Sequence, residues 1–147
     1  MPPANWQIRQ PESASEWSEY FDLRWRILRK PWGQPRGSER DEFETSATHV
    51  MAVDAAAKVV GVGRLHILQT GEGQIRYMAV EPAYEGQGIA TTILQKLEEA
   101  ATQNGIVTLR LNARENARGF YQCQGYHELG AASSAFGIPH IRMGKDI

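Results

Sequence analysis

The strongest constraint on the fold lies between residues 77 and 103, where a strand pattern, a glycine-rich turn and a helix pattern follow one another. Tyr77–Val80 closes an apolar, extended run, and residues 85–90 read Glu-Gly-Gln-Gly-Ile-Ala. After this turn, apolar side chains recur at helical spacing, namely Ile89, Ile93, Leu94, Leu97, Ala100 and Ala101. The stretch therefore predicts a strand, a tight turn and an amphipathic helix.

A glycine turn that opens a helix can bind an anion. The N–H groups of the first helical turn have no partner within the helix, and the helix dipole places partial positive charge there. Glycine also allows a phosphate to approach the backbone closely. Many α/β proteins use such a turn only for tight packing, so the turn alone leaves both a ligand site and a structural turn open.

Two common phosphate motifs do not fit this turn. A Walker A loop requires lysine after its last glycine, whereas Ile89 follows Gly88. The Rossmann pattern requires a third glycine where Thr91 stands, and it is followed by several further strand–helix units. Too few residues remain after Ala101 for those units, so a dinucleotide fold is disfavoured.

Two segments instead resemble motifs of the GCN5-related N-acetyltransferases, the GNAT superfamily. Its acyl-CoA turn reads Arg/Gln-x-x-Gly-x-Gly/Ala after a strand that ends Val-x-Pro, and residues 80–82 with 85–90 are similar to it. Residues 116–126 resemble the family segment N-x-x-A-x-x-F-Y-x-x-x-G-F/Y, and residues 137–143 resemble the closing strand of the ElaA-like branch. Glu85 departs from the pattern. Because a carboxylate would repel pyrophosphate by roughly 1 kcal/mol in a wet site, we expect its side chain to point to solvent.

The whole chain is compatible with this family. Its 147 residues predict one acyl-CoA N-acyltransferase domain over residues 1–147, and 41% hydrophobic with 22% charged residues is typical of a globular protein. A net charge of -1 gives no reason to expect a nucleic-acid partner, and no apolar run reaches membrane-spanning length. The first residues lack a signal-peptide pattern and Cys123 is the one cysteine, so we expect a cytoplasmic protein.

Periodicity predicts the remaining elements. The expected strands are 6–9, 49–53, 58–68, 74–80, 106–111, 126–129 and 138–143; the expected helices are 14–28, 89–103 and 115–124, with a short acidic helix over 38–44 and loops over 31–38 and 130–137. The fourth and fifth strands should be parallel, because a helix connects them. With the resemblance, this implies an α/β fold with a GNAT-like mixed, centrally splayed sheet of about seven strands, flanked by about four helices.

The resemblance also implies where acetyl-CoA binds. In this family the two central strands separate, and pantetheine lies in the gap, where unpaired backbone groups need partners. The residues that we assign to the co-substrate are Met78, Ala79, Val80, Gly86, Gln87, Gly88, Ile89, Ala90, Thr91 and Asn116. The alternative for Asn116 is a cap for the following helix.

Tyr121 is the candidate general acid, because the tyrosine of the resembled motif reaches the thioester sulfur. Its reference pKa near ~10 suits a donor to a leaving thiolate. The alternative is a core tyrosine bonded to a backbone carbonyl. For the general base we select His140, in the family-like closing segment. The other candidates are His66, His49, Glu72 and, through water, an acidic residue of the 38–44 segment. A main-chain N–H near Val80 should stabilise the thioester oxygen.

The acceptor side is the least determined. In the resembled family the region after the first helix lines the acceptor, so we predict Trp32 and Glu42 as substrate-binding residues. The acidic side chains Glu39, Asp41, Glu42 and Glu44 favour a cationic acceptor, although a solvated acidic face is the alternative. For Arg24, on the apolar face of the first helix, we expect a side chain that reaches out to solvent.

Together these features predict an acetyl-CoA-dependent N-acetyltransferase. The acceptor would be a small-molecule or peptide primary amine that attacks the thioester directly in a ternary complex. We expect no metal, no nucleic acid and no membrane partner, and a homodimer is possible. The alternatives are a CoA-binding sensor without catalysis and a protein-interaction module that does not bind CoA.

Overall fold

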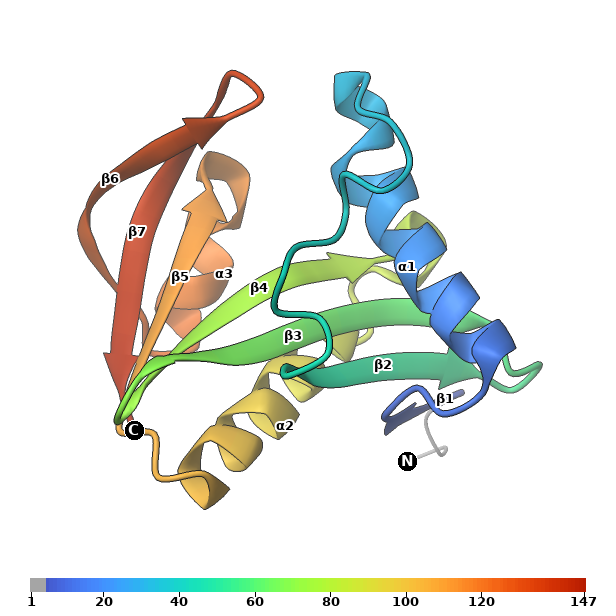
Figure 1. Ribbon diagram of the computed structural model, residues 1–147, viewed down its shortest axis with the longest axis horizontal. Coiled ribbons are helices and arrows are strands. Elements are labelled where there is room, and N and C mark those ends of the chain that lie inside the picture. Colours follow the sequence, from blue (N-terminus) through green and yellow to red (C-terminus); the bar gives the residue numbers. More distant parts are fainter. Residues whose placement is uncertain (1–4) are drawn as a thin grey trace.

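A computed structural model describes residues 5–147. Residues 1–4 lie outside the described residues, and they belong to the stretch that was examined for a signal-peptide pattern. Seven strands form one sheet in the order β1-β2-β3-β4-β5-β7-β6 (Figure 1). The strands are β1 Trp6–Arg9, β2 Thr48–Asp54, β3 Val59–Gln69, β4 Glu72–Val80, β5 Thr108–Arg114, β6 His127–Ala135 and β7 Ile138–Asp146. The helices are α1 Ala14–Leu28, α2 Ile89–Gln103 and α3 Arg118–Cys123, and short 3-10 turns are η1 Lys30–Trp32, η2 Pro82–Tyr84 and η3 Glu115–Ala117. The predicted mixed α/β fold is confirmed.

The two long helices cover opposite faces of the sheet (Figure 1). Alternate residues of β2 show this, because Val50 and Ala52 join the core under α2, whereas Met51 and Val53 join the core under α1. Both helices have the bounds that periodicity predicted. None of the helices within residues 5–147 combines the length and apolar character that a membrane crossing would need.

Two glycines let α2 approach the sheet closely. A Cβ atom on Gly61 of β3 would lie 2.6 Å from Ile89 Cγ2, and one on Gly63 would lie 2.6 Å from Ile93 Cγ2. No real Cβ tolerates such a contact. The absence of side chains at these two glycines therefore allows the start of α2 to pack directly against β3. The N-terminus of α2 is thereby fixed beside the end of β4.

The sheet is splayed at its centre, as the resemblance implied. β4 and β5 are parallel but pair only from Glu72 to Gln74 with Thr108 to Arg110. Beyond these pairs β5 stays paired to β7 on its other edge, and β4 stays paired to β3. The two strands therefore diverge towards their carboxyl ends, which leaves a gap in the middle of the sheet (Figure 1).

A bulge in β4 lies within the splayed part. The register with β3 shifts between Val62, opposite Ala79, and Arg64, opposite Arg76. Tyr77, one of the two residues between these pairs, has a φ of 59°, which is uncommon for a residue other than glycine. Bulges of this kind interrupt pairing and redirect side chains next to functional sites.

Two segments differ from the sequence-based prediction. Residues 38–44 form turns, and the predicted acidic helix is absent, because side chains take the place of helical hydrogen bonds. Asp41 Oδ1 accepts from the Phe43 N–H at 2.9 Å, and Glu44 Oε2 accepts from the Asp41 N–H at 3.0 Å.

The predicted loop over residues 130–137 is instead mostly strand. β6 continues to Ala135 and pairs antiparallel with β7, and only Phe136 and Gly137 form the turn. Both have positive φ, 56° and 77°, which is the geometry of a two-residue type I′ hairpin. The small residues of β6 carry little strand propensity of their own, so its conformation depends on pairing with β7.

Candidate active site

A cleft of about 600 Å³ lies between the end of β4 and the N-terminus of α2, and we call it the glycine-turn cleft. It brings together nine of the ten residues assigned to the co-substrate. Its lining is Met78, Ala79, Val80, Tyr84, Glu85, Gly86, Gly88, Ile89, Ala90, Thr91, Asn116, Ala117, Phe120 and Tyr121. Gln87, the tenth, is exposed and does not line it.

The α2 N-terminus offers free amide groups to this cleft. Thr92 is the first residue whose N–H bonds within the helix, to the Gly88 carbonyl at 3.0 Å, and no side chain caps the end. Gly88 itself has a φ of 85°, and nothing lies within 4 Å of where its Cβ would be. An anion could therefore reach the amides of the first turn without displacing protein atoms.

Backbone groups of β4 face the same cleft. The Glu81 N–H donates to the Val60 carbonyl on β3 at 2.8 Å. Amide groups of successive residues in a strand point to opposite edges, so the amides of Val80 and Met78 face the edge from which β5 has diverged. These groups could bond the amide-bearing pantetheine arm.

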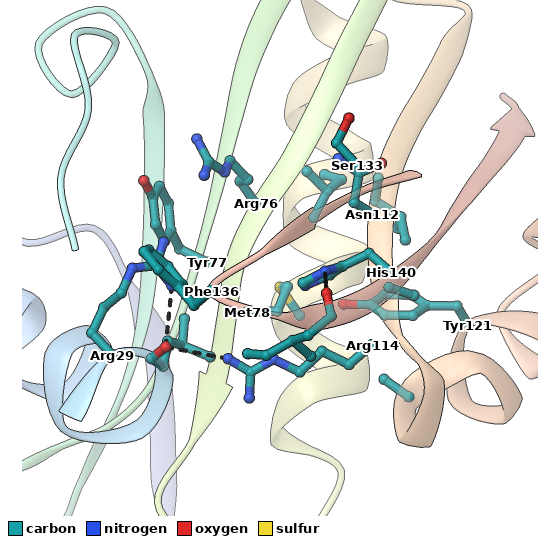
Figure 2. A pocket seen from close by; sticks show the side chains of 16 residues that line it. Arg29, Arg76, Tyr77, Met78, Asn112, Arg114, Tyr121, Ser133, Phe136 and His140 are labelled. Carbon is teal, nitrogen blue, oxygen red and sulfur yellow. Dashed lines mark hydrogen bonds between the residues drawn. The ribbon is translucent and has the colours of Figure 1, made fainter. Parts of the chain in front are cut away.

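A second cavity of about 190 Å³ lies on the other side of the splay, and we call it the arginine cavity (Figure 2). Residues of α1, β4, β5, β6 and β7 meet there. The lining is Leu28, Arg29, Ile75, Arg76, Tyr77, Met78, Leu111, Asn112, Ala113, Arg114, Ala117, Tyr121, Ser133, Phe136, Ile138 and His140. Met78, Ala117 and Tyr121 line both the cleft and the cavity, so the two spaces adjoin at these residues.

Tyr121 is buried at this junction, with its hydroxyl directed into the cavity (Figure 2). Within residues 5–147 its hydroxyl makes no hydrogen bond, so the alternative of a core tyrosine bonded to a carbonyl does not describe it. Burial raises the pKa of the Tyr121 hydroxyl well above its ordinary value of 10.0, which keeps the proton in place at neutral pH.

Of the five candidate bases, His140 is the one that lines the arginine cavity with Tyr121. Its Nδ1 lies 2.9 Å from the Ile138 carbonyl oxygen, which can only accept a hydrogen bond. The proton of the neutral ring is therefore on Nδ1, and Nε2 is free to accept another. The roles of Tyr121 and His140 stay predictions.

The other base candidates are engaged elsewhere. His49 lies 2.9 Å from the Tyr20 hydroxyl through Nδ1, and His66 stacks on Phe43 with ring centroids 4.5 Å apart. Burial lowers the pKa of both histidines. Glu72 lies at the start of β4, outside both spaces.

The predicted acceptor and helix-cap residues occupy other positions. Trp32 is 44% exposed and lies outside the cavity, although the guanidinium of Arg114 stands 5.8 Å from its ring centroid. Glu42 is exposed and lines neither space. Asn116 does not cap α3, because the cap residue is Ala117 and no side chain bonds that end. The structure thus brings neither Trp32 nor Glu42 to the reacting centre.

Two carboxylates of the acidic segment bond to arginines. Asp41 accepts from Arg64 at 2.6 Å and from Arg76 at 2.9 Å, and Glu44 accepts from Arg24 at 2.9 Å and from Arg64 at 3.0 Å. Arg24 is 0% exposed, so the expectation that its side chain reaches solvent is wrong. None of the carboxylates of this segment lines the arginine cavity, and the cationic acceptor stays a prediction.

Sequence reasoning missed the arginines that dominate the cavity. Arg29 Nη1 and Arg114 Nη2 both donate to the Leu28 carbonyl oxygen, at 3.1 and 3.2 Å (Figure 2). Burial lowers the pKa of both guanidinium groups, and for Arg29 the nearby charges of Arg76 and Arg114 lower the pKa further. No motif marks these residues, because α1, β4 and β5 contribute them separately.

Comparison with known proteins agrees with this geometry. The family model described as "Acetyltransferase (GNAT) domain" matches residues 34–147. A Bacillus subtilis (strain 168) protein provisionally named an acetyltransferase is 26% identical over 139 residues, covering 94% of this chain and 95% of its own.

Solved structures share the fold. Escherichia coli ElaA superposes with a TM-score of 0.78 at 19% identity, covering 95% of this chain and 97% of its own. An aminoglycoside 6'-N-acetyltransferase complexed with coenzyme A superposes with a TM-score of 0.81 at 19% identity, covering 95% and 96%. Since the family model covers most of the chain, from just after η1 to the C-terminal strand, the protein belongs to the GNAT family of acetyltransferases.

Proposed function

We propose that this protein is an acetyl-CoA-dependent N-acetyltransferase that acetylates a small primary amine by direct attack in a ternary complex. One observation carries the proposal: the hydroxyl of the buried Tyr121 side chain has no hydrogen-bond partner within residues 5–147 and lies where the glycine-turn cleft meets the arginine cavity. A proton donor at the junction of a cofactor-sized cleft and a separate cavity is what acyl transfer between two substrates requires.

The cleft accounts for the co-substrate. The amides of the first α2 turn would bind pyrophosphate, and the free backbone groups of Met78 and Val80 would bind pantetheine. Acetyl-CoA, when bound, supplies the acetyl group as a thioester. A thioester at the end of the pantetheine arm would lie beside Met78, Ala117 and Tyr121, the residues common to both spaces.

Two side chains would move the protons. His140 Nε2 accepts a proton from the ammonium group of the acceptor, which frees the nitrogen lone pair to form a C–N bond with the thioester carbon. As the C–S bond breaks, Tyr121 donates its proton to the leaving thiolate. A β4 amide near the bulge would stabilise the negative charge on the carbonyl oxygen. The new C–N bond leaves one surplus proton on the nitrogen, which passes to the tyrosinate as the amide forms. His140 then releases its proton to solvent, so that both side chains are restored.

The size of the cavity supports a small acceptor. A volume of about 190 Å³ is below the ~300–1,000 Å³ that is usual for drug-sized ligands. Of the two acceptor classes considered from the sequence, a small-molecule amine therefore fits better than a peptide.

Calorimetric titration with acetyl-CoA and CoA tests the cleft. We expect micromolar binding, about -8 kcal/mol, that Gly88→Val weakens at least about tenfold. Gly105→Val is the matched control, because Gly105 is at the other end of α2, has a similar φ of 74° and is equally unobstructed. An absence of binding to the wild type would overturn the proposal.

Tyr121→Phe tests catalysis separately from binding. The variant loses no hydrogen bond of the folded chain, so we expect normal CoA affinity with thiol release reduced about 100-fold or more. Unchanged turnover would remove Tyr121 from its role. CoA binding without turnover of any amine by the wild type would favour the sensor alternative.

A further inference from the structure

We infer that the acceptor amine carries an anionic group, a carboxylate or a phosphate, which Arg29 and Arg114 bind. This inference rests on the proposed function, because it names the class of acceptor for the same site. Its basis is that these two arginines reach the cavity without a carboxylate partner from the protein.

The partners of both arginines are neutral. Arg29 is 9% exposed, and it donates to the carbonyl oxygens of Ser38 and Leu28 at 3.0 and 3.1 Å. Arg114 donates to the Leu28 carbonyl alone, at 3.2 Å. Within residues 5–147 neither forms an ion pair. Arg29 is buried and Arg114 is partly buried, and most charges in such positions are paired. Two neighbouring guanidinium groups that share one carbonyl are therefore an exception that calls for an external anion.

The wider charge balance agrees. Five guanidinium groups, those of Arg24, Arg29, Arg64, Arg76 and Arg114, lie around the cavity and the core beneath it. Among the described residues, only two carboxylates, Asp41 and Glu44, contact any of them. The cavity itself is lined by Arg29, Arg76, Arg114 and His140 and by no Asp or Glu of the described chain.

The end of α1 offers a competing explanation. Leu28 is the last residue of α1, and a helix C-terminus attracts cations. That dipole amounts to about half a negative charge, whereas Arg29 and Arg114 bring two positive charges to it. The helix end can therefore orient the two side chains, but it cannot neutralise them.

Register places the anion site close to the candidate base. Arg114 on β5 is directly opposite His140 on β7, so both side chains project from the same face of the sheet. An acceptor that meets both residues has its amine and its anionic group only a few bonds apart. Amino acids and short amino phosphates have this arrangement, whereas an aminoglycoside is a polycation that the arginines would repel.

The test is calorimetry on the free protein and on the protein saturated with CoA, using matched amines. The pairs are L-phenylalanine with L-phenylalaninamide, β-alanine with β-alaninamide, and O-phosphoethanolamine with ethanolamine; kanamycin is the polycationic probe. We expect at least one anionic member to bind about 10- to 100-fold more tightly than its counterpart without the anionic group, the effect of hydrogen bonds to charged groups. The carboxylate and phosphate pairs identify which anion is preferred.

Arg114→Gln should abolish this preference. In thiol-release assays it should raise the KM for the anionic amine and leave the KM for acetyl-CoA unchanged. Arg110→Gln is the matched control, because Arg110 is on the same strand and lines neither space. CoA binding separates the two proposals. Its absence would overturn the proposed function, whereas the amine pairs, measured on the free protein, would still test whether the cavity binds an anionic group. Equal binding within every pair, tighter binding of kanamycin, or no binding of any probe would overturn the inference.

Discussion

Two groups of arginines meet near the ring of Tyr77, and their partners differ. The guanidinium carbons of Arg24 and Arg64 lie 4.2 and 4.8 Å from the centroid of Tyr77, and that of Arg29 lies 5.5 Å away. Arg24 and Arg64 bond to carboxylates of the 38–44 segment. Arg29 and its neighbour Arg114 bond to carbonyl oxygens only.

The difference separates a structural role from a binding role. A buried ion pair costs desolvation energy but becomes essential once formed, because the loss of one partner leaves the other charge buried and alone. An arginine without such a partner adds little to folding and keeps its charge available for a ligand. By this argument, an arginine paired with a carboxylate stabilises the fold, and an arginine bonded only to carbonyl oxygens is available to bind a ligand.

Arg64→Gln should break the paired group and have the largest effect. The Arg64 side chain is 0% exposed, and its replacement removes the bidentate contact to Asp41 and one contact to Glu44. We expect a loss on the order of 3 kcal/mol in the free energy of unfolding, measured by urea denaturation. Arg110→Gln on β5 should change it by less than about 0.5 kcal/mol. A loss below about 1 kcal/mol for Arg64→Gln would show that the ion pairs are not structurally important.

Local patterns in the sequence sufficed for much of the fold. Periodicity predicted the bounds of α1, and the apolar spacing after Gly88 predicted those of α2, because neighbouring residues determine both. The residues of the glycine-turn cleft come from two short segments, 78–91 and 116–121, to which the resemblance to the family motifs pointed.

The arginine cavity could not be predicted in this way. Arg29 and Arg114 are 85 positions apart in the chain, and they meet only because α1 ends beside β5. A carboxylate run such as residues 39–44 looks the same in the sequence whether it faces a substrate or an interior arginine, so its composition alone does not indicate the charge of the acceptor. Whether an arginine lacks a partner is a property of the assembled fold.

Acidification should weaken the paired group by an intermediate amount. Burial alone would raise the pKa of Asp41, but hydrogen bonds from Arg64 and the Phe43 N–H outweigh it and lower the pKa from 3.8 to about 2. Because the pKa of Asp41 is lower in the folded than in the unfolded state, its ionised carboxylate stabilises the fold at pH values above the unfolded-state pKa. This contribution disappears as the pH falls from about 4 to about 2. The predicted loss is about 2 kcal/mol. Urea denaturation across this pH range should show the stability of Asp41→Asn falling less steeply than that of the wild type, and parallel slopes would contradict the prediction.

Arg114→Gln should have the smallest effect on folding, and it tests the group of arginines that has no carboxylate partner among the described residues. The lost hydrogen bond to Leu28 costs about 1 kcal/mol, but removing a charge held next to Arg29 offsets it, so stability should stay within about 1 kcal/mol of the wild type. An anionic amine from the matched pairs, at ten times its dissociation constant, should then stabilise the wild type by about 1.4 kcal/mol and the variant by far less. If Arg114→Gln instead destabilised the protein as strongly as Arg64→Gln, its charge would belong to the structure and the contrast between the two groups would fail.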